Sequence, residues 1–575
     1  MGINKKIARL FDELALFLEL EGVQWKPEAY RTAANTINNF DKDIKKIYDD
    51  EGVEGLKKIN GVGENIAKHI EEYFKFKKIK KLEELRKKYS TELIELAQLE
   101  GLGPKKVKIL FDELNITSKK ELEKAIKNKE IRKLEGFGAV SEKNILQSLN
   151  FQKKRQDRML LDQAKRIADE FISYLKRESN PKKIDYAGSL RRLKETIGDI
   201  DILVITDKGK QTMNAFTKYH GIKKIISKGE TRSSIILEED NIHIDLRVIL
   251  EDSYPAALQY FTGSQAHNIE LRKIALKKGY KLSEYGLFEK NTNKKIALKN
   301  ENELYKKLGL EYIPPELREN KGELELSKKN KLPKLIKKID VKGDLHIHTK
   351  YSEGLNTIED MAKEAIKKGY EYIAITDHSK SRKIAGGLNE EDLKKQWREI
   401  DELNKKLKIK ILKGSEVDIL KNGELDYPKD ILEKFDFVIG SVHTNFKMSE
   451  KEMTKRLIKA LENEHLQVLG HPTGRILKKR TSYDADYKKI FNVAAKNNKL
   501  IEINSQPERL DVDSELIYEA KKQGVKFIIN TDAHIKTNLN YMQFGIGQAR
   551  RGYLQKNDVV NTKSYVKFKN NLNKK

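Results

Sequence analysis

The chain contains 575 residues, a length that predicts several domains. Its formal net charge of +27 at pH 7 favours a polyanionic partner such as nucleic acid, although a lysine-rich genome would produce the same excess of positive charge. It contains no cysteine, so disulfides and thiolate metal sites are excluded. The N-terminus lacks the apolar core of a signal peptide and no apolar run approaches the ~18 residues of a membrane span, so we expect a soluble, cytoplasmic protein.

The first 150 residues have the apolar spacing of short helices and carry an internal repeat. The pattern apolar-x-Gly-apolar-Gly occurs at 59–63, 99–103 and 134–138, each time before helix-forming sequence. It resembles the helix-hairpin-helix motif, whose glycines allow a tight turn and leave N–H groups free for a DNA phosphate. The alternative is that one copy only links helices and does not contact DNA, and the third copy is the first candidate for this. We divide the region into 1–85 and 86–150 and expect DNA contacts from Gly61, Gly63, Gly101, Gly103, Lys105 and Lys106.

Two carboxylates open the next predicted strand. Asp199 and Asp201 begin the apolar run DIDILVIT, and residues i and i+2 of a strand point to the same face. Asp245, in the run IHIDLRVIL, can join them from a neighbouring strand. Three such carboxylates suit Mg²⁺, and two ions ~3.5–4 Å apart stabilise the attacking and leaving oxygens of a phosphoryl displacement. A lone Asp-x-Asp at a strand end is common, but this combination predicts a nucleotidyl-transfer site.

A Gly-Ser turn precedes these strands. Gly188, Ser189 and Arg192 can bind a triphosphate through backbone N–H groups, a hydroxyl and a guanidinium. Helical and strand-like segments mix around this turn, which predicts an α+β fold built on a mixed sheet. We therefore place a nucleotidyltransferase palm at 151–235, a nucleotide-selection subdomain that completes it at 236–318, and a charged, aperiodic linker at 319–340.

From residue 341 onward, short apolar strands alternate with Lys/Glu-rich helices. This alternation predicts a barrel-like α/β domain over 341–575 with functional groups at the C-terminal ends of its strands. Nine histidine, aspartate and glutamate residues lie at or near the predicted strand ends of this domain. Imidazole and carboxylate groups suit Zn²⁺, Mn²⁺ or Fe²⁺, and nine ligands exceed the needs of one ion. We therefore expect two or three ions and a bridging hydroxide that attacks a phosphate ester. One His-x-His alone would be weak, since strand histidines often cap a core. The nine residues are His346, His348, Glu353, His378, Glu416, His443, His471, Asp532 and His534.

With the acidic triad and the glycine repeats, residues 1–318 resemble a family X DNA polymerase of the DNA polymerase β type. The segment YFTGS at 260–264, followed by an asparagine and an arginine, is similar to that family's nucleotide-binding segment. The resemblance implies that Asp199 and Asp201 bind both metals and that Asp245 is the third carboxylate. It further implies phosphate contacts from Ser189, Arg192 and Gly198, sugar contacts from Tyr260, Phe261 and Gly263, a base-edge contact from Asn268 and a template-side contact from Arg272.

Two positions depart from that family pattern. His243 stands where the family usually has an arginine near the primer end, so we expect a weaker or pH-dependent primer contact. The segment around Tyr30 and the helix after Gly63 resemble the family's small lyase domain, whose lysine forms a Schiff base with an abasic sugar. His69 occupies that lysine's place and Lys68 precedes it. Because adjacent helical residues differ in direction by ~100°, we expect DNA 5′-phosphate binding with weak or absent lyase chemistry.

The order of the nine C-terminal ligands resembles the polymerase and histidinol phosphatase (PHP) domain. Glu353 stands where many members have aspartate, and it keeps the charge with a longer reach. The resemblance implies a distorted (β/α)7-type barrel. Together the two resemblances cover nearly the whole chain and match the polymerase X architecture of bacteria and archaea, whose PHP domain carries 3′→5′ exonuclease and related 3′-end or abasic-site phosphodiesterase activity.

We therefore predict a template-directed, gap-filling DNA polymerase with two Mg²⁺ ions, joined to a Mn²⁺- or Zn²⁺-dependent 3′→5′ exonuclease and acting in base-excision or break repair. The expected partners are gapped or primer–template DNA with 5′-phosphate ends and deoxynucleoside triphosphates (dNTPs), with no membrane. We expect a monomer that joins the nucleoid when bound to DNA. One alternative is a phosphatase of small phosphate esters with a DNA-binding N-terminal half, which the intact nucleotide-binding segment disfavours. The other is a non-enzymatic scaffold that bridges DNA ends, which both ligand sets disfavour.

Overall fold

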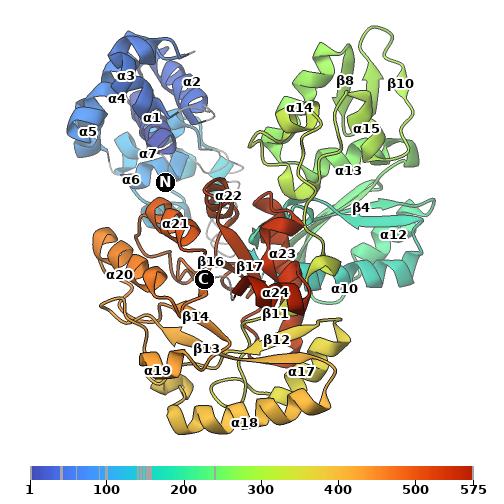
Figure 1. Ribbon diagram of the computed structural model, residues 1–575. Coiled ribbons are helices and arrows are strands. Elements are labelled where there is room, and N and C mark those ends of the chain that lie inside the picture. The colour runs from blue at the N-terminus through green and yellow to red at the C-terminus, as the bar shows by residue number, and fades with distance from the viewer. Residues whose placement is uncertain are drawn as a thin grey trace. The chain divides into compact units, whose positions relative to one another are not determined.

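The computed structural model describes residues 3–38, 43–59, 61–89, 91–97, 102–138, 141–142, 145–146, 149, 158–238 and 241–572. The chain forms two compact units, Met1–Asp157 and Arg158–Lys575 (Figure 1). Within the ranges given, no helix is both long and apolar enough to cross a bilayer.

The first unit is helical. Its amphipathic helices each bury one apolar face, and these faces form a single core that includes Phe11, Phe17 and Leu110. The described elements are α1 (Ile3–Leu20), α2 (Lys26–Asn38), α3 (Ile44–Lys57), α4 (Glu64–Phe76), α5 (Lys80–Lys88), α6 (Thr91–Ala97), α7 (Pro104–Leu114), α8 (Lys119–Lys127) and η1 (Ile131–Lys133).

Glycines occupy the turns that lead into α4 and α7. Gly61 has a φ of +83°, and a Cβ there would lie 3.1 Å from Thr32 Cγ2, so this turn requires glycine for both conformation and space. Gly63 and Gly103 are the N-cap residues of α4 and α7, and neither position makes a side-chain cap hydrogen bond. The first-turn N–H groups of both helices therefore lack a side-chain cap and could bind a phosphate, except at Pro104, the first residue of α7, which has no N–H. Gly101, also expected at DNA, lies outside the described residues.

The second unit begins with the region predicted as the palm. Its five-stranded mixed sheet, in the order β2-β4-β7-β6-β5, runs past residue 235 to Val248, so residues 158–253 are called the palm below. β4 and β7 pair in parallel, and the other neighbours pair antiparallel. Phe171 of α10 and Phe216 of α12 pack together in the core beside the sheet. The elements are β1 (Met159–Leu160), α10 (Leu161–Ser179), β2 (Lys183–Tyr186), α11 (Gly188–Arg191), β3 (Thr196–Ile197), β4 (Asp199–Ile205), α12 (Gly209–Phe216), β5 (Ile222–Lys228), β6 (Arg232–Leu237), β7 (His243–Val248) and η3 (Glu251–Ser253).

A smaller subdomain follows, with a three-stranded antiparallel sheet in the order β10-β9-β8. Its core joins Leu271, Leu304 and Leu317 to Leu324. Leu324 belongs to α16, which lies inside the stretch 319–340 that we predicted as a linker. The elements are α13 (Tyr254–Thr262), α14 (Gln265–Lys277), β8 (Tyr280–Ser283), β9 (Gly286–Glu289), β10 (Lys295–Ile296), α15 (Glu301–Lys307), η4 (Pro315–Leu317) and α16 (Glu323–Lys328).

The C-terminal part of the second unit is a barrel of seven parallel strands, ordered as in the sequence from β11 to β17. A parallel bridge between Ile347 and Ala533 joins the regions after the first and last strands, so the sheet is nearly closed. This arrangement confirms the predicted α/β barrel. The strands are β11 (Gly343–Asp344), β12 (Tyr372–Ile375), β13 (Lys410–Asp418), β14 (Phe437–Ser441), β15 (Val468–Leu469), β16 (Leu500–Asn504) and β17 (Lys526–Asn530).

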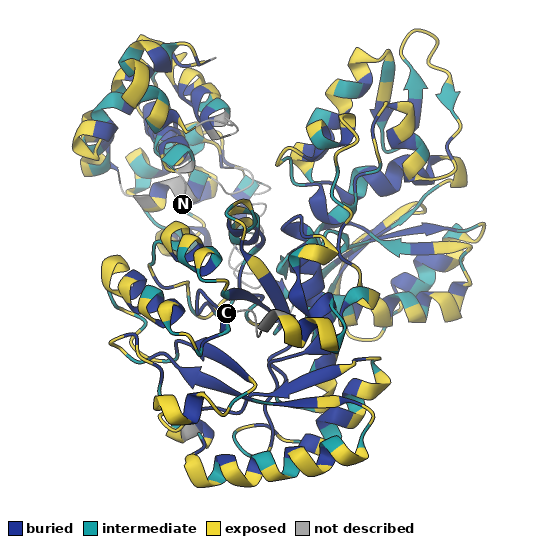
Figure 2. Ribbon diagram, viewed as in Figure 1, coloured by how far each residue is buried: buried dark blue, intermediate teal, exposed yellow. Residues whose placement is uncertain are grey.

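The barrel strands are buried almost throughout, whereas the surrounding helices expose one face (Figure 2). Burial on both faces explains why these strands are continuous apolar runs rather than alternating ones. The other elements of this part are η5 (Lys338–Asp340), α17 (Ile358–Lys367), η6 (Lys383–Ala385), α18 (Glu390–Lys406), α19 (Lys429–Leu432), α20 (Glu450–Glu462), α21 (Tyr487–Lys496), α22 (Ser514–Lys522), η7 (Lys536–Tyr541), α23 (Met542–Arg551), η8 (Lys556–Asp558), η9 (Val560–Thr562) and α24 (Tyr565–Leu572).

Two candidate metal centres

Three carboxylates meet on adjacent palm strands. The register of β4 and β7 places Asp199 opposite His243 and Asp201 opposite Asp245. Asp199 lies two residues before Asp201 and therefore faces the same side of the sheet. Burial and then the charges of Asp199 and Asp245 raise the pKa of Asp201 to about 7. A divalent cation would relieve this repulsion, so the donor set fits Mg²⁺.

The turn at α11 approaches this centre closely. Gly188 has a φ of +59°, and a Cβ there would collide with a carboxylate oxygen of Asp201. The buried hydroxyl of Ser189 has no hydrogen-bond partner among the residues described, which leaves it available to a phosphate oxygen. On the neighbouring strand, the Ser234 hydroxyl donates a hydrogen bond to Asp245. The turn and the carboxylates thus form one continuous site.

Arg192 follows the turn and is tightly held. Its Nε donates to Glu319 Oε1 at 3.0 Å, and its Nη1 donates to the Thr262 carbonyl. Gly263 has a φ of +69°, and a Cβ there would lie 3.1 Å from Arg192 Nη1. Gly198 is equally constrained, since its Cβ would lie 2.8 Å from a guanidinium nitrogen of Arg158. Both glycines therefore make room for arginine side chains.

The predicted nucleotide-binding segment spans the end of α13 and the start of α14. The rings of Tyr260 and Phe261 meet edge to face, with centroids 5.2 Å apart. The Asn268 amide nitrogen donates to the Tyr260 carbonyl at 2.7 Å, and its oxygen accepts from Gln259 at 2.8 Å. In this structure Asn268 thus joins the two helices, and a base-edge contact would require these bonds to be exchanged. Arg272 lies exposed on α14.

A buried histidine near this segment escaped the sequence analysis. His267 Nδ1 lies 2.6 Å from Glu323 Oε1, and its Nε2 lies 2.9 Å from the Tyr305 hydroxyl. All three side chains are buried. The partner Glu323 could have indicated a buried histidine, since a buried imidazole needs a hydrogen-bond partner. However, Glu323 falls in the stretch that we predicted as a linker.

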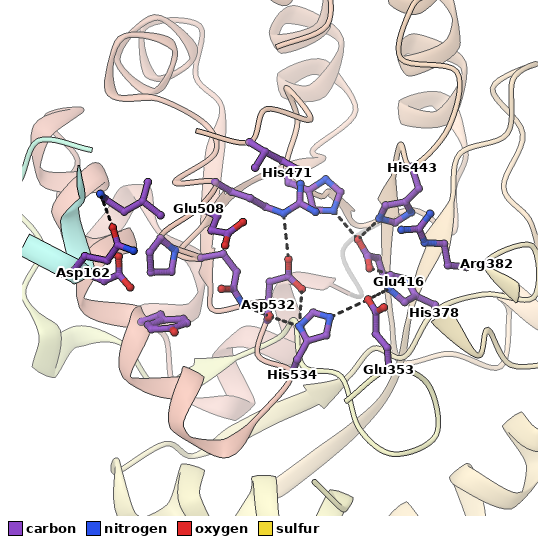
Figure 3. A pocket seen from close by; sticks show the side chains of 17 residues that line it. Asp162, Glu353, His378, Arg382, Glu416, His443, His471, Glu508, Asp532 and His534 are labelled. Atoms are coloured by element: carbon purple, nitrogen blue, oxygen red, sulfur yellow. Dashed lines mark hydrogen bonds and ion pairs between the residues drawn. The ribbon is translucent and has the colours of Figure 1, made fainter. Parts of the chain in front are cut away.

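The second centre lies at the C-terminal ends of the barrel strands, around a cavity of about 290 Å³. The predicted ligands follow β11, β12, β14, β15 and β17 or lie in β13. Glu416 of β13 is central, since its oxygens lie 2.8–3.4 Å from imidazole nitrogens of five histidines. These are His346, His348, His378, His443 and His471. Figure 3 shows three of these, His378, His443 and His471, beside Glu416.

Two further carboxylates complete the cluster. Asp532 Oδ1 lies 3.5 Å and 3.2 Å from the Nε2 atoms of His346 and His348. Glu353 Oε1 lies 2.9 Å from His378 Nε2 and 3.0 Å from His534 Nε2. Ligand atoms in three overlapping triads lie within 4.8 Å of one another. The structure therefore brings all nine predicted residues together.

The histidines of the cluster differ in protonation. Burial lowers the pKa of two of them, His348 and His471, whereas for the other four the neighbouring carboxylates outweigh burial and raise the pKa; these are His346, His378, His443 and His534. Buried ring nitrogens of His346 and His348 have no hydrogen-bond partner in the described part of the chain. Burial, and then repulsion from His534 and His378, lowers the pKa of His348 to about 3. Neutral imidazole is the form that coordinates a metal, so this donor set suits a divalent transition metal.

Two carboxylates that orient the ligands were missed by the sequence analysis. Glu502 Oε1 lies 2.7 Å from His346 Nδ1, and Asp418 Oδ1 lies 2.5 Å from His443 Nδ1. Contacts at Nδ1 turn each ring so that Nε2 faces Glu416, at 3.4 Å for His346 and 3.3 Å for His443. A carboxylate inside an apolar strand, as in LIEIN, needs a buried partner, and this signal could have identified Glu502.

Arginines and part of the palm complete the cavity wall. Arg382 Nε and Arg509 Nη1 are buried without a hydrogen-bond partner in the described ranges, and both residues line the cavity. Guanidinium donors beside metal ligands suit a phosphate oxygen. Asp162 and Gln163, from the first turn of α10, line the same cavity (Figure 3). The palm thus contributes to the wall of the barrel's site.

In the first unit, α4 directs Lys68 and His69 to different partners. His69 Nδ1 lies 2.8 Å from the Tyr30 hydroxyl, and burial lowers the pKa of His69. Lys68 is exposed and forms an ion pair with Glu64 at 3.0 Å. The expectation of weak or absent lyase chemistry stays a prediction.

The predicted DNA-contacting lysines lie on the first turn of α7. Lys105 is exposed. Lys106 Nζ donates to Ser141 Oγ at 3.1 Å and lies 5.2 Å from the centre of the Phe137 ring. Both amines lie close to the N-terminus of α7, where they would add positive charge to a phosphate site.

Comparison with known protein families gives four matches along the chain. A helix-hairpin-helix domain matches residues 3–79, and a SAM-like helix-hairpin-helix tandem matches 93–150. The DNA polymerase beta thumb matches 257–319, and the PHP domain matches 344–506. The matches follow the order of the glycine turns, the palm-associated subdomain and the barrel.

Individual relatives fall into two groups. The DNA polymerase/3′-5′ exonuclease PolX of Bacillus subtilis (strain 168) is 38% identical over 564 residues, which cover 98% of each chain. Probable phosphatase Teth514_1060 of Thermoanaerobacter sp. (strain X514) is 32% identical over 245 residues, which cover 39% of this chain and 94% of the relative. A probable phosphatase of Acetivibrio thermocellus is 32% identical over 219 residues, or 36% of this chain and 83% of the relative.

Proposed function

The chain belongs to the family X DNA polymerases that carry a C-terminal PHP domain, and from this premise we propose that it fills short gaps in DNA and trims 3′ ends. One observation carries the proposal: the second unit contains both a strand-borne carboxylate triad and a histidine-rich barrel cluster. Each donor set suits divalent cations and phosphate chemistry, and the resemblance to a polymerase/exonuclease extends over the full length.

In the palm, we infer that Asp199, Asp201 and Asp245 hold two Mg²⁺ ions, which when bound neutralise charge on the attacking and leaving oxygens. The chain's own residues bind and orient the dNTP. Ser189 and Arg192 would bind the triphosphate, and backbone N–H groups of the Gly188 turn would add donors. The Tyr260 ring would pack against the sugar, where it excludes a 2′-hydroxyl, while Arg192 stabilises charge on the departing pyrophosphate.

In the barrel, we infer two or three Mn²⁺ or Zn²⁺ ions around Glu416, which supply Lewis-acid activation of a phosphodiester when bound. Arg382 and Arg509 would hold the phosphate that faces the cluster. Glu502 and Asp418 keep the imidazole rings in their coordinating orientation. A volume of about 290 Å³ suits one terminal nucleotide better than a duplex segment.

DNA repair is the role that best fits this pair of activities. The first unit offers two helix N-termini led by glycine N-caps, which suit DNA phosphates. We propose that one of them, on α4, takes the 5′-phosphate at the far side of a gap while the palm extends the 3′ end. The protein would act as a monomer on gapped DNA.

A primer-extension assay tests this proposal. We expect faster incorporation, with Mg²⁺ or Mn²⁺, on a short gap with a 5′-phosphate than on an open primer–template, and 3′ trimming when dNTPs are omitted. Equal incorporation rates on both substrates would argue against gap repair.

The match to probable phosphatases over the barrel supports a second candidate, a phosphatase of small phosphate esters. Turnover of a small phosphomonoester and of single-stranded DNA by the same preparation would separate the two. Preference for the ester, without dNTP incorporation, would favour the phosphatase.

A further inference from the structure

We propose that Arg551, on helix α23 of the barrel, is a positioning residue for dNTP binding in the palm, and that it acts through Glu319 and the main chain of Arg192. The inference rests on the proposed function, which assigns Arg192 to the triphosphate. It adds a physical link by which the nuclease domain sets the geometry of the nucleotide site.

Arg192 is fixed at three points. Its Nε donates to Glu319 Oε1 at 3.0 Å, its Nη1 donates to the Thr262 carbonyl, and its own carbonyl accepts from Arg551 Nη1 at 3.0 Å. The side chains of Arg192 and Glu319 are only 12% and 14% exposed. All three contacts thus come from outside the palm, and none of them uses Nη2, which is the guanidinium end left for a phosphate.

Arg551 reaches this network from the last turn of α23. Its side chain is 5% exposed. The Nη1 atom that bonds the Arg192 carbonyl also donates to Glu319 Oε1 at 3.2 Å. One carboxylate oxygen therefore accepts from a palm arginine and a barrel arginine at the same time.

Glu319 is ionised at neutral pH. Burial opposes its ionisation, but the charges of Arg551, Arg192 and Lys194 hold the pKa of Glu319 at about 2. A buried carboxylate that loses one of three close cations draws more strongly on the remaining two. Removing the guanidinium of Arg551 would shift Glu319 toward Arg192 and free the Arg192 main chain, which directly follows α11 and its phosphate-binding turn.

The expected consequence is a cost in dNTP binding rather than in chemistry. A guanidinium that must be ordered by the ligand binds more weakly than a preorganised one, by roughly two- to tenfold for one side chain. Asp199, Asp201 and Asp245 do not contact Arg551 in any hydrogen bond or ion pair of the described residues, so kcat should change little. Among the described residues, the hydrogen bonds and ion pairs of Arg551 go to Arg192 and Glu319 and to none of the barrel cluster.

Arg550 provides a matched control on the same helix. Its Nε donates to Glu316 Oε1 at 2.6 Å, and its Nη1 donates to the Ile336 carbonyl at 2.9 Å. Arg550→Gln therefore removes a guanidinium that joins α23 to the preceding subdomain without touching Arg192 or Glu319.

The test measures steady-state incorporation by the full-length protein on gapped DNA as the dNTP concentration is varied. We expect Arg551→Gln to raise the KM for dNTP roughly two- to tenfold while kcat stays within about twofold of the wild type. Arg551→Lys should raise the KM less. Arg550→Gln should have the KM and kcat of the wild type. Glu319→Gln should also raise KM, and the Glu319→Gln/Arg551→Gln double variant should show less than the sum of the two effects, because both act through one network. Hydrolysis of 3′ ends should be unchanged in Arg551→Gln.

A wild-type KM in Arg551→Gln would overturn the inference. So would an equal increase in Arg550→Gln, which would indicate a general effect of domain packing. If the wild type incorporated no dNTP on gapped DNA, the proposed function would fail, and the inference would fail with it. A normal KM in an active Arg551→Gln variant would instead overturn the inference alone, so the two failures can be distinguished.

Discussion

Gly188 shows how a single residue shapes the polymerase centre. Its φ of +59° and the closeness of the Asp201 carboxylate leave no space for a side chain. The sequence predicted that Gly188 belongs to a phosphate-binding turn, but its contact with Asp201 depends on how the turn folds back onto β4. That closeness makes the glycine a positioning element for a carboxylate as well as a donor of backbone N–H groups.

We predict that Gly188→Ala reduces dNTP incorporation by about 100-fold, because a displacement of the order of 1 Å at a reacting centre costs that much. Single-turnover extension of a one-nucleotide gap measures the effect. Gly209→Ala is the control, since a Cβ at this palm glycine meets no atom closer than 3.7 Å. Near-normal extension by Gly188→Ala would show that the turn does not constrain Asp201.

At the scale of elements, the strand ends of the barrel bring together the nine residues that we propose as metal ligands of the nuclease. Glu416 lies in β13. The two carboxylates that orient its histidine partners are Asp418, also in β13, and Glu502, in β16. Parallel strands bring their C-terminal ends to one rim, so even His346 and Glu502, far apart in sequence, are neighbours. Those outer contacts should therefore matter nearly as much as the ligands themselves.

We predict that Glu502→Gln weakens metal binding or nuclease activity by about 10- to 100-fold, because the contact to His346 Nδ1 loses its charge. Metal content after dialysis and the rate of 3′ hydrolysis measure the effect, and dNTP incorporation should be unchanged. The exposed Glu519 offers a matched control, as Glu519→Gln removes only a surface ion pair with Lys522. Full metal occupancy and full hydrolysis in Glu502→Gln would contradict this role.

The elements also show what sequence could and could not predict. Continuous apolar strands predicted the parallel barrel, and histidines at strand ends predicted the cluster, because both follow from local periodicity. The stretch 319–340 was harder. Its charged residues suggested a linker, yet Glu323 there bonds the buried His267, and Glu319 holds Arg192. Such pairs join residues 56 and 127 positions apart, so no local pattern reveals them.

At the scale of the second unit, two centres of different composition share one folded body. The palm centre uses carboxylates on β4 and β7, which suit Mg²⁺, and the barrel centre uses mainly histidines, which suit softer divalent ions. The parts are nevertheless joined: Asp162 of the palm lines the barrel cavity, and Arg551 of the barrel bonds Arg192 of the palm. We therefore propose separate chemistry at the two centres on a shared framework.

One measurement tests that claim most directly: extension and 3′ hydrolysis by Asp245→Ala and His346→Ala on the same gapped DNA, with folding checked by circular dichroism. We predict that Asp245→Ala loses incorporation and keeps hydrolysis, because the barrel ligands are untouched, and that His346→Ala does the reverse. Loss of both activities in either folded variant would contradict the existence of two independent centres.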